Sequence, residues 1–77
     1  MTSNFVAYLR KIIKAPVMIT NIDGYTYKLT GTYSILSERT AHGTVADDII
    51  YRLKRCSKIA AVGSWSMNEL YVKFIGG

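Results

Sequence analysis

Residues 25–36, with the sequence YTYKLTGTYSIL, show the clearest alternation of hydrophobic and polar positions in the chain. Successive side chains of a strand point to opposite faces, so this alternation predicts a half-buried strand around which the fold is organised. Gly31 interrupts the hydrophobic row, and because a residue without Cβ tolerates a bulge, we expect one long, bent strand. A hairpin turn at Thr30 and Gly31 is the alternative. The predicted core-facing row is Tyr25, Tyr27, Leu29, Tyr33 and Ile35.

Asp23 and Gly24 separate this strand from another that is predicted over residues 17–22. Asp-Gly between two strands is typical of a type I′ hairpin, whose two central residues both need positive φ. A two-residue turn also sets which residues face each other across the hairpin. The expected pairs, all on the core face, are Met18 with Leu29, Thr20 with Tyr27, and Ile22 with Tyr25.

Hydrophobic residues recur at helical spacing near the N-terminus, which predicts a first helix. Ser3 is the expected N-cap. Pro16 should end the helix at Ala15, because proline disfavours helical geometry in the residue before it. The predicted buried stripe is Phe5, Val6, Leu9, Ile12 and Ile13.

A second helix is predicted to begin at Thr44 and to end near Lys58. Thr44 with Asp47 is an aspartate variant of the capping box, in which each side chain satisfies a backbone N–H group of the other residue. Asp48 and Arg52 lie four residues apart and should form an ion pair on this helix. The predicted apolar face is Val45, Ala46, Ile49, Ile50, Leu53 and Cys56.

Two further strands are predicted over residues 59–66 and 70–75, with a turn at 67–69. The polar residues 37–43 are predicted to form a loop. The last strand is hydrophobic on both faces, so we expect it to be central or covered. Gly63 weakens the strand before it and indicates a bulge or a sheet edge.

The order of these elements, αββαββ, predicts a two-layer α+β domain that spans residues 1–77 as one unit. Two helices should pack on one face of a four-stranded antiparallel sheet. Trp65, Tyr71 and Ile75 have no obvious place in such a core, and the sheet has at least one open edge. We therefore expect the chain to form a homo-oligomer, most simply a symmetric dimer.

Cysteine and histidine are too few to support several classes of function. With one Cys and one His, the 77-residue chain offers neither an intrachain disulfide nor a Cys/His zinc cluster. The sequence shows no signal peptide and no hydrophobic run close to the ~20 residues of a membrane span. These features favour a cytoplasmic protein without a metal, a cofactor or a membrane partner.

The ionisable residues do not suggest an active site. Asp47 and Asp48 are adjacent on a helix and point in different directions, so they cannot act on one substrate as an acid–base pair. His42 is expected to be a solvated loop residue, although it precedes a helix N-terminus at which a phosphate could bind. Cys56 lies on the apolar helix face, about 20 Å from His42 at 1.5 Å per residue. We predict that the protein is not an enzyme.

The chain carries a net charge of +5, and its cations cluster on the two predicted helices. Cations with interleaved aromatic rings suit phosphate contact and base stacking, so we expect a small regulatory module that binds nucleic acid. A solvated helical face, on which long side chains cover apolar surface, is the non-functional interpretation. The candidate binding residues are Arg10, Lys11, Lys14, Tyr51, Arg52, Lys54, Arg55 and Lys58.

The alternative function is an inhibitor or adaptor that docks through the same surface on an acidic host protein. Tyrosine and arginine would then dominate the interface energy, as they do in many complexes. The size, the tyrosine content and the lack of a catalytic set resemble those of many small phage or mobile-element accessory proteins, which act by binding a host component. The hydroxyl-rich face of residues 26–34 is a second candidate surface, but it lacks the paired aromatics of RNA-recognition sheets.

Overall fold

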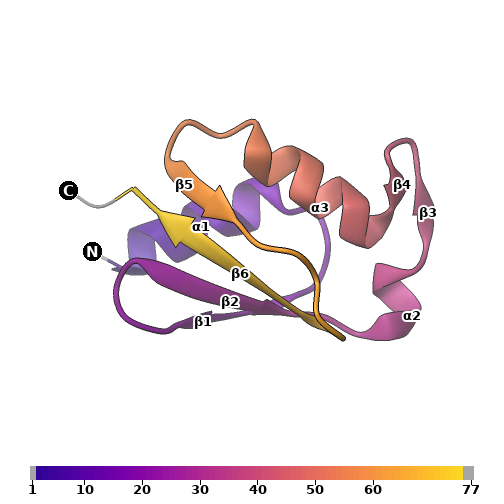
Figure 1. Ribbon diagram of the computed structural model, residues 1–77, viewed down its shortest axis with the longest axis horizontal. Helices are drawn as coiled ribbons and strands as arrows, with labels where there is room; N and C mark the ends of the chain where they lie inside the picture. Colours follow the sequence, from indigo (N-terminus) through magenta and orange to yellow (C-terminus); the bar gives the residue numbers. More distant parts are fainter. Residues whose placement is uncertain (1, 76–77) are drawn as a thin grey trace.

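Two long helices and a four-stranded sheet form the two layers of the molecule (Figure 1). A computed structural model describes residues 2–75 of the chain. The strands are antiparallel in the order β1-β2-β6-β5, and β3 pairs with β4 in a separate two-stranded ribbon. The predicted α+β architecture is confirmed, with one additional short helix. The elements are α1 (Thr2–Ile12), β1 (Met18–Asn21), β2 (Thr26–Thr30), α2 (Tyr33–Leu36), β3 (Arg39–Thr40), β4 (Gly43–Thr44), α3 (Val45–Lys54), β5 (Ile59–Val62) and β6 (Glu69–Phe74).

One cluster of buried side chains joins both long helices to one face of the sheet. Tyr27 and Leu29 alternate along β2, and their partners on β6 are Val72 and Leu70. Because alternate residues of a strand share a face, these two central strands present one continuous apolar surface to the helices. The predicted stripes are buried in part: Val6, Ile12, Val45, Ala46 and Ile50 are only partly buried, and Cys56 lies beyond α3 and outside the cluster. The cluster consists of Phe5, Leu9, Ile13, Val17, Tyr27, Leu29, Leu36, Ile49, Leu53, Leu70 and Val72.

The hairpin of β1 and β2 differs from the predicted register by one residue. Ile19 lies opposite Leu29 and Asn21 opposite Tyr27. A one-residue shift exchanges the two faces of a strand, so Met18 is 66% exposed and Ile19 packs against the core in its place. The predicted inward face of β2 is right at Tyr27 and Leu29, whereas that of β1 is wrong. The hairpin residues wrongly assigned to the core are Met18, Thr20, Ile22 and Tyr25, of which Tyr25 is 54% exposed.

The turn of this hairpin is longer than predicted because the Asp23 carboxylate binds the backbone that follows it. Its Oδ1 accepts hydrogen bonds from the backbone N–H groups of Tyr25 at 3.0 Å and of Thr26 at 2.7 Å. These bonds hold the pKa of Asp23 below its usual value, and the bond from Tyr25 has the largest effect. Gly24 has a φ of +89°, while Asp23 is not among the residues with positive φ, so the turn is not of type I′.

Residues 31–36 form neither a continuation of β2 nor a hairpin. Thr32 is the N-cap of α2, and its carbonyl oxygen accepts a hydrogen bond from the Leu36 N–H at 2.9 Å. This turn carries Leu36 into the core and leaves Tyr33 75% exposed. Leu36 packs closely over Gly31, where a Cβ would lie 3.0 Å from Leu36 Cδ2. The predicted long, bent strand is therefore wrong beyond Thr30.

Several predicted boundaries also shift. Ser3 lies inside α1 and is not its N-cap, and α1 ends at Ile12, three residues before Ala15. The segment predicted as a loop contains β3 and the start of β4. The second long helix, α3, ends at Lys54, with Arg55 as its C-cap, so Lys58 lies beyond it.

The C-terminal strands confirm part of the prediction and correct another part. β6 is a central strand, and β5 is an edge strand with an irregular register between Ile59 and Ala61. β5 ends at Val62, and the chain beyond it folds back onto α3. Trp65 packs there against the core, and its Nε1 donates a hydrogen bond to the Ala46 carbonyl at 3.0 Å. The expectation that Trp65 has no place in the monomer is wrong.

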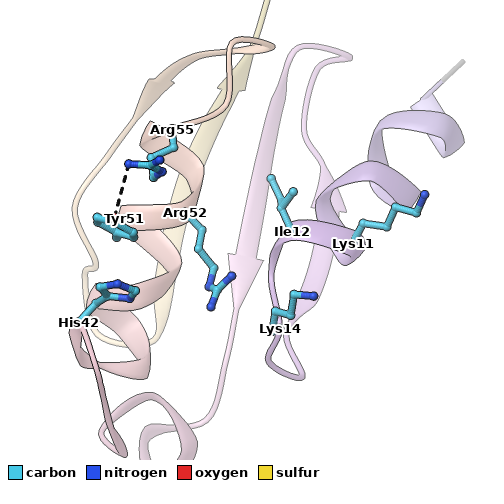
Figure 2. A pocket seen from close by; sticks show the side chains of 7 residues that line it. All are labelled: Lys11, Ile12, Lys14, His42, Tyr51, Arg52 and Arg55. Carbon is cyan, nitrogen blue, oxygen red and sulfur yellow. Dashed lines mark hydrogen bonds between the residues drawn. The ribbon is translucent and has the colours of Figure 1, made fainter.

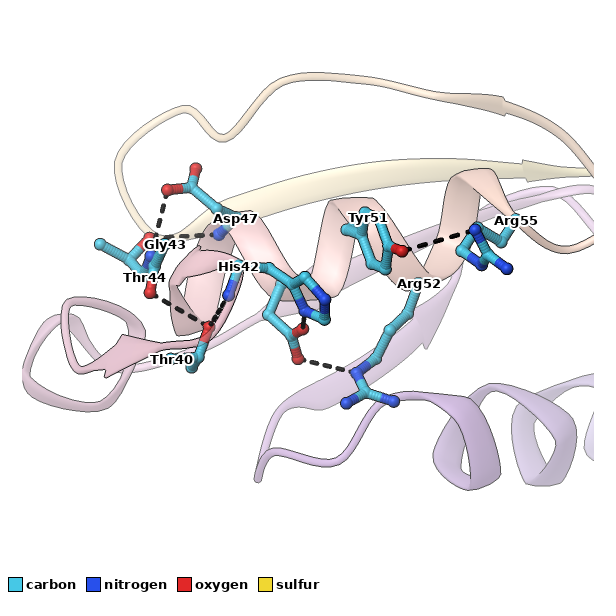
Figure 3. A network of polar contacts seen from close by, with 9 residues as sticks. Thr40, His42, Gly43, Thr44, Asp47, Tyr51, Arg52 and Arg55 are labelled. Atoms are coloured by element: carbon cyan, nitrogen blue, oxygen red, sulfur yellow. Dashed lines mark hydrogen bonds and ion pairs between the residues drawn. The ribbon is translucent and has the colours of Figure 1, made fainter.

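A capping box starts α3, as the sequence predicts (Figure 3). The Asp47 N–H donates to Thr44 Oγ1 at 3.1 Å, and the Thr44 N–H donates to Asp47 Oδ2 at 3.1 Å. Gly43 precedes the box with a φ of +105°. A Cβ at Gly43 would lie 2.6 Å from Asp47 Oδ2, so this backbone fits the cap only without a side chain.

Candidate functional site

An open groove of about 400 Å³ lies between the α1 side and the α3 side of the helical layer (Figure 2). Positively charged residues stand on both of its walls, and Ile12 provides an apolar contact between them. One wall comes from α1 and the residues that follow it, and the other from α3 and the turn between β3 and β4. We call this feature the basic groove. Its lining residues are Lys11, Ile12, Lys14, His42, Tyr51, Arg52 and Arg55.

The helical repeat explains why the α3 wall carries these residues. Ile49 and Leu53 are buried against the sheet, four residues apart on one side of the helix. Tyr51 and Arg55, also four residues apart, share the exposed side. Arg52 lies between the two sides and is half-buried, with its guanidinium reaching toward the α1 wall (Figure 2).

Asp48 links two groove residues through its carboxylate. Its Oδ2 accepts a hydrogen bond from Arg52 Nε at 2.7 Å, which confirms the predicted ion pair. Its Oδ1 lies 2.6 Å from His42 Nδ1. Both bonds hold the pKa of Asp48 below its usual value, and the bond to Arg52 has the larger effect. The carboxylate thus fixes the orientation of both side chains.

The groove also contains a short column of stacked groups. The rings of His42 and Tyr51 stack with centroids 4.1 Å apart and planes 19° apart. The Arg55 guanidinium carbon lies 5.4 Å from the Tyr51 ring centroid, and its Nη1 donates to the Tyr51 hydroxyl at 3.4 Å. Tyr51 lies between His42 and Arg55 in Figure 3. Such cation–π and aromatic contacts hold the rings in place before any ligand binds.

His42 and Ile12 line the groove although neither is among the predicted binding residues, and His42 is the polar one of the two. His42 is exposed, as expected for a solvated residue, with 39% of its side chain accessible, but it also stacks on Tyr51 and contacts Asp48. The turn between β3 and β4 places it there, and the His42 N–H donates to Thr40 Oγ1 at 3.1 Å. In the sequence, His42 and Asp48 are six residues apart. This spacing predicts a contact only when the β3–β4 ribbon before α3 is known.

The structure divides the predicted binding residues into two groups. Lys11, Lys14, Tyr51, Arg52 and Arg55 line the basic groove, whereas Arg10, Lys54 and Lys58 do not. Arg10 Nη1 instead donates to the Val17 carbonyl at 3.4 Å. Lys58 Nζ lies 4.9 Å from the ring centroid of Tyr8, in a cation–π contact. These two cations stabilise local structure rather than extend the groove.

Cys56 does not line the groove that contains His42. Its Sγ donates to the Arg52 carbonyl at 3.3 Å, and a hydrogen bond with Cys56 raises the pKa of the Tyr8 hydroxyl. Within residues 2–75, no cluster of three or more His, Cys, Asp or Glu side chains is placed to hold a metal ion. None of the helices in this same range has the length and apolar character of a membrane span.

Asp48 should make the stability of the protein sensitive to acid. Its pKa is lowered in the folded state, so its contribution is complete above the unfolded value of about 3.9 and is lost as pH falls through the folded value. We expect Asp48→Asn to be less stable than wild type at pH 7, with a difference that shrinks below about pH 4. Urea unfolding of both proteins over this pH range measures the effect.

The exposed carboxyl of Glu38 provides the control for this experiment. Glu38→Gln removes the same charge without touching the contacts of Asp48, and Asp23 is common to all three proteins. A stability difference between wild type and Asp48→Asn that stays constant from neutral to acidic pH would contradict the assignment.

Comparison with known proteins adds no relative to this picture: no family model, no curated protein and no solved structure matches the chain.

Proposed function

We propose that this protein is a small, non-enzymatic regulatory module that binds nucleic acid in the basic groove. The observation that carries this proposal is the presence of cations on both walls of one groove. Lys11 and Lys14 come from the N-terminal part of the chain, and Arg52 and Arg55 from α3. A polyanion that lies between the walls would contact both at once.

The cations of the groove are largely free to bind a ligand. Among the described residues, no ion pair joins Lys11, Lys14 or Arg55 to a carboxylate. Arg52 uses Nε for Asp48, which leaves its two terminal nitrogens directed into the groove (Figure 2). Terminal guanidinium nitrogens are well suited to bidentate contact with a phosphate, while the lysines act as mobile point charges.

Asp48 neutralises part of the charge of Arg52, with which it forms an ion pair at 2.7 Å. The groove stays positively charged because Lys11, Lys14 and Arg55 form no ion pair among the described residues. The net charge of +5 for the whole chain favours the approach of polyanions from solution. Local and overall charge therefore act in the same direction.

A protein inhibitor or adaptor remains the second candidate, and the exposure of Tyr51 beside Arg55 favours it. Tyrosine and arginine are the residue types that most often dominate protein interfaces. Capture of partners from a nuclease-treated host lysate separates the two functions. A specific acidic protein that is retained after nuclease treatment, and that is released by substitution of Tyr51, supports this candidate over nucleic acid.

Nucleic-acid binding should depend on salt through the groove lysines. The affinity of wild type for a labelled oligonucleotide should fall linearly with salt on logarithmic axes. In the double variant Lys11→Ala/Lys14→Ala, the slope should decrease by about 0.7 to 0.9 for each phosphate that the protein no longer neutralises. At low salt the affinity should fall about tenfold or more, because the lysines no longer donate charged hydrogen bonds. Fluorescence anisotropy across a salt series measures both quantities.

Lys73 supplies the matched control for this experiment. It is exposed on β6, on the face of the sheet opposite the helices, so Lys73→Ala removes a charge without changing the groove. We expect its slope to remain close to that of wild type. Absence of binding at low salt, or an equal loss in Lys73→Ala, would contradict the proposed function.

A further inference from the structure

We infer that the basic groove takes a single strand of nucleic acid, with a phosphate between Lys14 and Arg52 and a base stacked on His42. This inference rests on the proposed function and specifies its ligand. It follows from three features of the groove: its concave shape, the exposed end of its stacked column, and the rigidity of that end before binding.

The shape of the groove favours one strand over a duplex. The cations stand on opposite walls of a recess of about 400 Å³. A duplex carries its phosphates on a convex surface and is read by elements that protrude into its grooves. Its phosphates would therefore reach one wall at a time. The backbone of a single strand can enter the recess and bind Lys14 and Arg52 together.

The stacked column ends in a ring that a base can extend. Tyr51 stacks with His42 and has the Arg55 guanidinium carbon 5.4 Å from its ring centroid, so part of its ring is already in contact. The His42 ring is the other end of the column: it lines the groove, it stacks on Tyr51, and 39% of its side chain remains exposed. Unstacked bases of single strands pack on His, Tyr, Phe and Trp rings, and these contacts tolerate any base.

His42 is held in position without a ligand. Asp48 binds its Nδ1, Tyr51 covers one ring face, and its backbone N–H is bound to Thr40. A side chain that is already ordered loses little conformational entropy when a base stacks on it. The same residues therefore place a stacking surface and a phosphate site in one groove at fixed relative positions.

The opposite face of the sheet offers a weaker site for a strand. Sheets that bind RNA stack two or three bases on aromatic residues. Within the described sheet, the central strands present one aromatic side chain on that face, Tyr71, which is 47% exposed. Its neighbour Lys28 lies 3.7 Å from Glu69 and is partly neutralised. The basic groove combines cations and a stacking column, so we place the strand there.

None of the proposed contacts is to the 2′-hydroxyl. Every proposed contact is to a phosphate or to the face of a base. RNA and DNA strands of the same sequence should consequently bind within about threefold of each other, because the 2′-hydroxyl is the group through which proteins distinguish them.

Anisotropy with short labelled strands and the corresponding duplex tests the inference at about 50 mM salt. We expect wild type to bind RNA and DNA strands at least tenfold more tightly than the duplex, as an order-of-magnitude estimate from base stacking. A strand that contains 2-aminopurine reports stacking directly, since its fluorescence should be quenched when the base packs on His42.

Three variants separate stacking from charge. His42→Ala should weaken strand binding about tenfold and abolish the quenching, whereas His42→Phe should restore much of both. Lys14→Ala should weaken binding but keep the quenching at saturation. Thermal unfolding followed by the fluorescence of Trp65, which contacts α3, verifies that each variant is folded.

Each outcome of the test has a distinct meaning. Equal or tighter binding of the duplex overturns the single-strand inference and keeps the proposed function, while absence of any binding overturns both. Strand binding in which His42→Ala keeps full affinity and quenching also overturns the inference. A preference of more than about tenfold for RNA or for DNA would contradict the absence of sugar recognition.

Discussion

Replacing Tyr27 with alanine should lower the free energy of unfolding by about 3 to 5 kcal/mol, the usual cost of removing a large aromatic residue from a packed core. Tyr27 is 1% exposed in the middle of the sheet, opposite Val72 on β6. Its ring lies 4.9 Å from that of Phe5 on α1, so the substitution affects both layers. Small domains have a total stability of roughly 5 to 15 kcal/mol, so this one change should remove a large share of it. Urea unfolding followed by circular dichroism measures the difference.

Tyr71 provides a matched control on the neighbouring strand. It is the same residue type but lies on the face of the sheet away from the helices. Tyr71→Ala should cost less than about 1 kcal/mol, and Thr30→Ala, on the same face, less than ~0.5 kcal/mol. A larger loss of stability for either control than for Tyr27→Ala would show that the assigned faces of β2 and β6 are reversed.

Gly43→Ala should cost about 2 to 3 kcal/mol, although it adds only one methyl group. The backbone at Gly43 has a φ of +105°, which strains a residue with a Cβ. The added Cβ would also lie 2.6 Å from Asp47 Oδ2 and push this carboxylate out of the capping box. The backbone strain and the loss of the capping hydrogen bonds both lower the free energy of unfolding, so their costs add. The same urea experiment measures the change, and amide hydrogen exchange in the first turn of α3 should become faster.

Gly24→Ala separates the two causes. Gly24 also has a positive φ, +89°, but a Cβ there would have no atom within 4 Å. Only the strain remains, and its cost should be about 1 to 2 kcal/mol. Equal losses of stability for the two glycine variants would indicate that the contact with Asp47 contributes nothing to the effect.

The sequence predicted those parts of the fold that depend on residues close together in the chain. The alternation around Tyr27 and Leu29 identified the inward face of β2, and the spacing of Phe5, Leu9 and Ile13 identified that of α1. Thr44 with Asp47 predicted the start of α3, because a capping box is complete within four residues.

The prediction failed where a side chain competed with the backbone pattern. Two hydrogen bonds to Asp23 lengthened the hairpin turn by one residue, and this exchanged the faces of β1. Leu36 is not in the predicted core-facing row, but it enters the core from α2. Neither effect leaves a periodic signal in the sequence.

Only those parts of the candidate site that depend on helical spacing could be predicted from the sequence. Helical spacing placed Lys11, Tyr51 and Arg55 on outer surfaces, and these residues do line the groove. Whether the two surfaces face each other depends on how the helices pack on the sheet, which no local pattern contains. The early end of α3 removes Lys58 from the helix, and only the β3–β4 ribbon brings His42 to Asp48.

The order of the sheet has a consequence for avidity. β1 and β5 end the sheet, and both long helices cover the same face of it. If two copies paired through β1 around a two-fold axis normal to the sheet, both helical layers would stay on one side. Two basic grooves would then point in the same direction, and a long strand held by one groove would reach the other at a high effective concentration. The dimer would then bind a long strand more tightly than one groove alone.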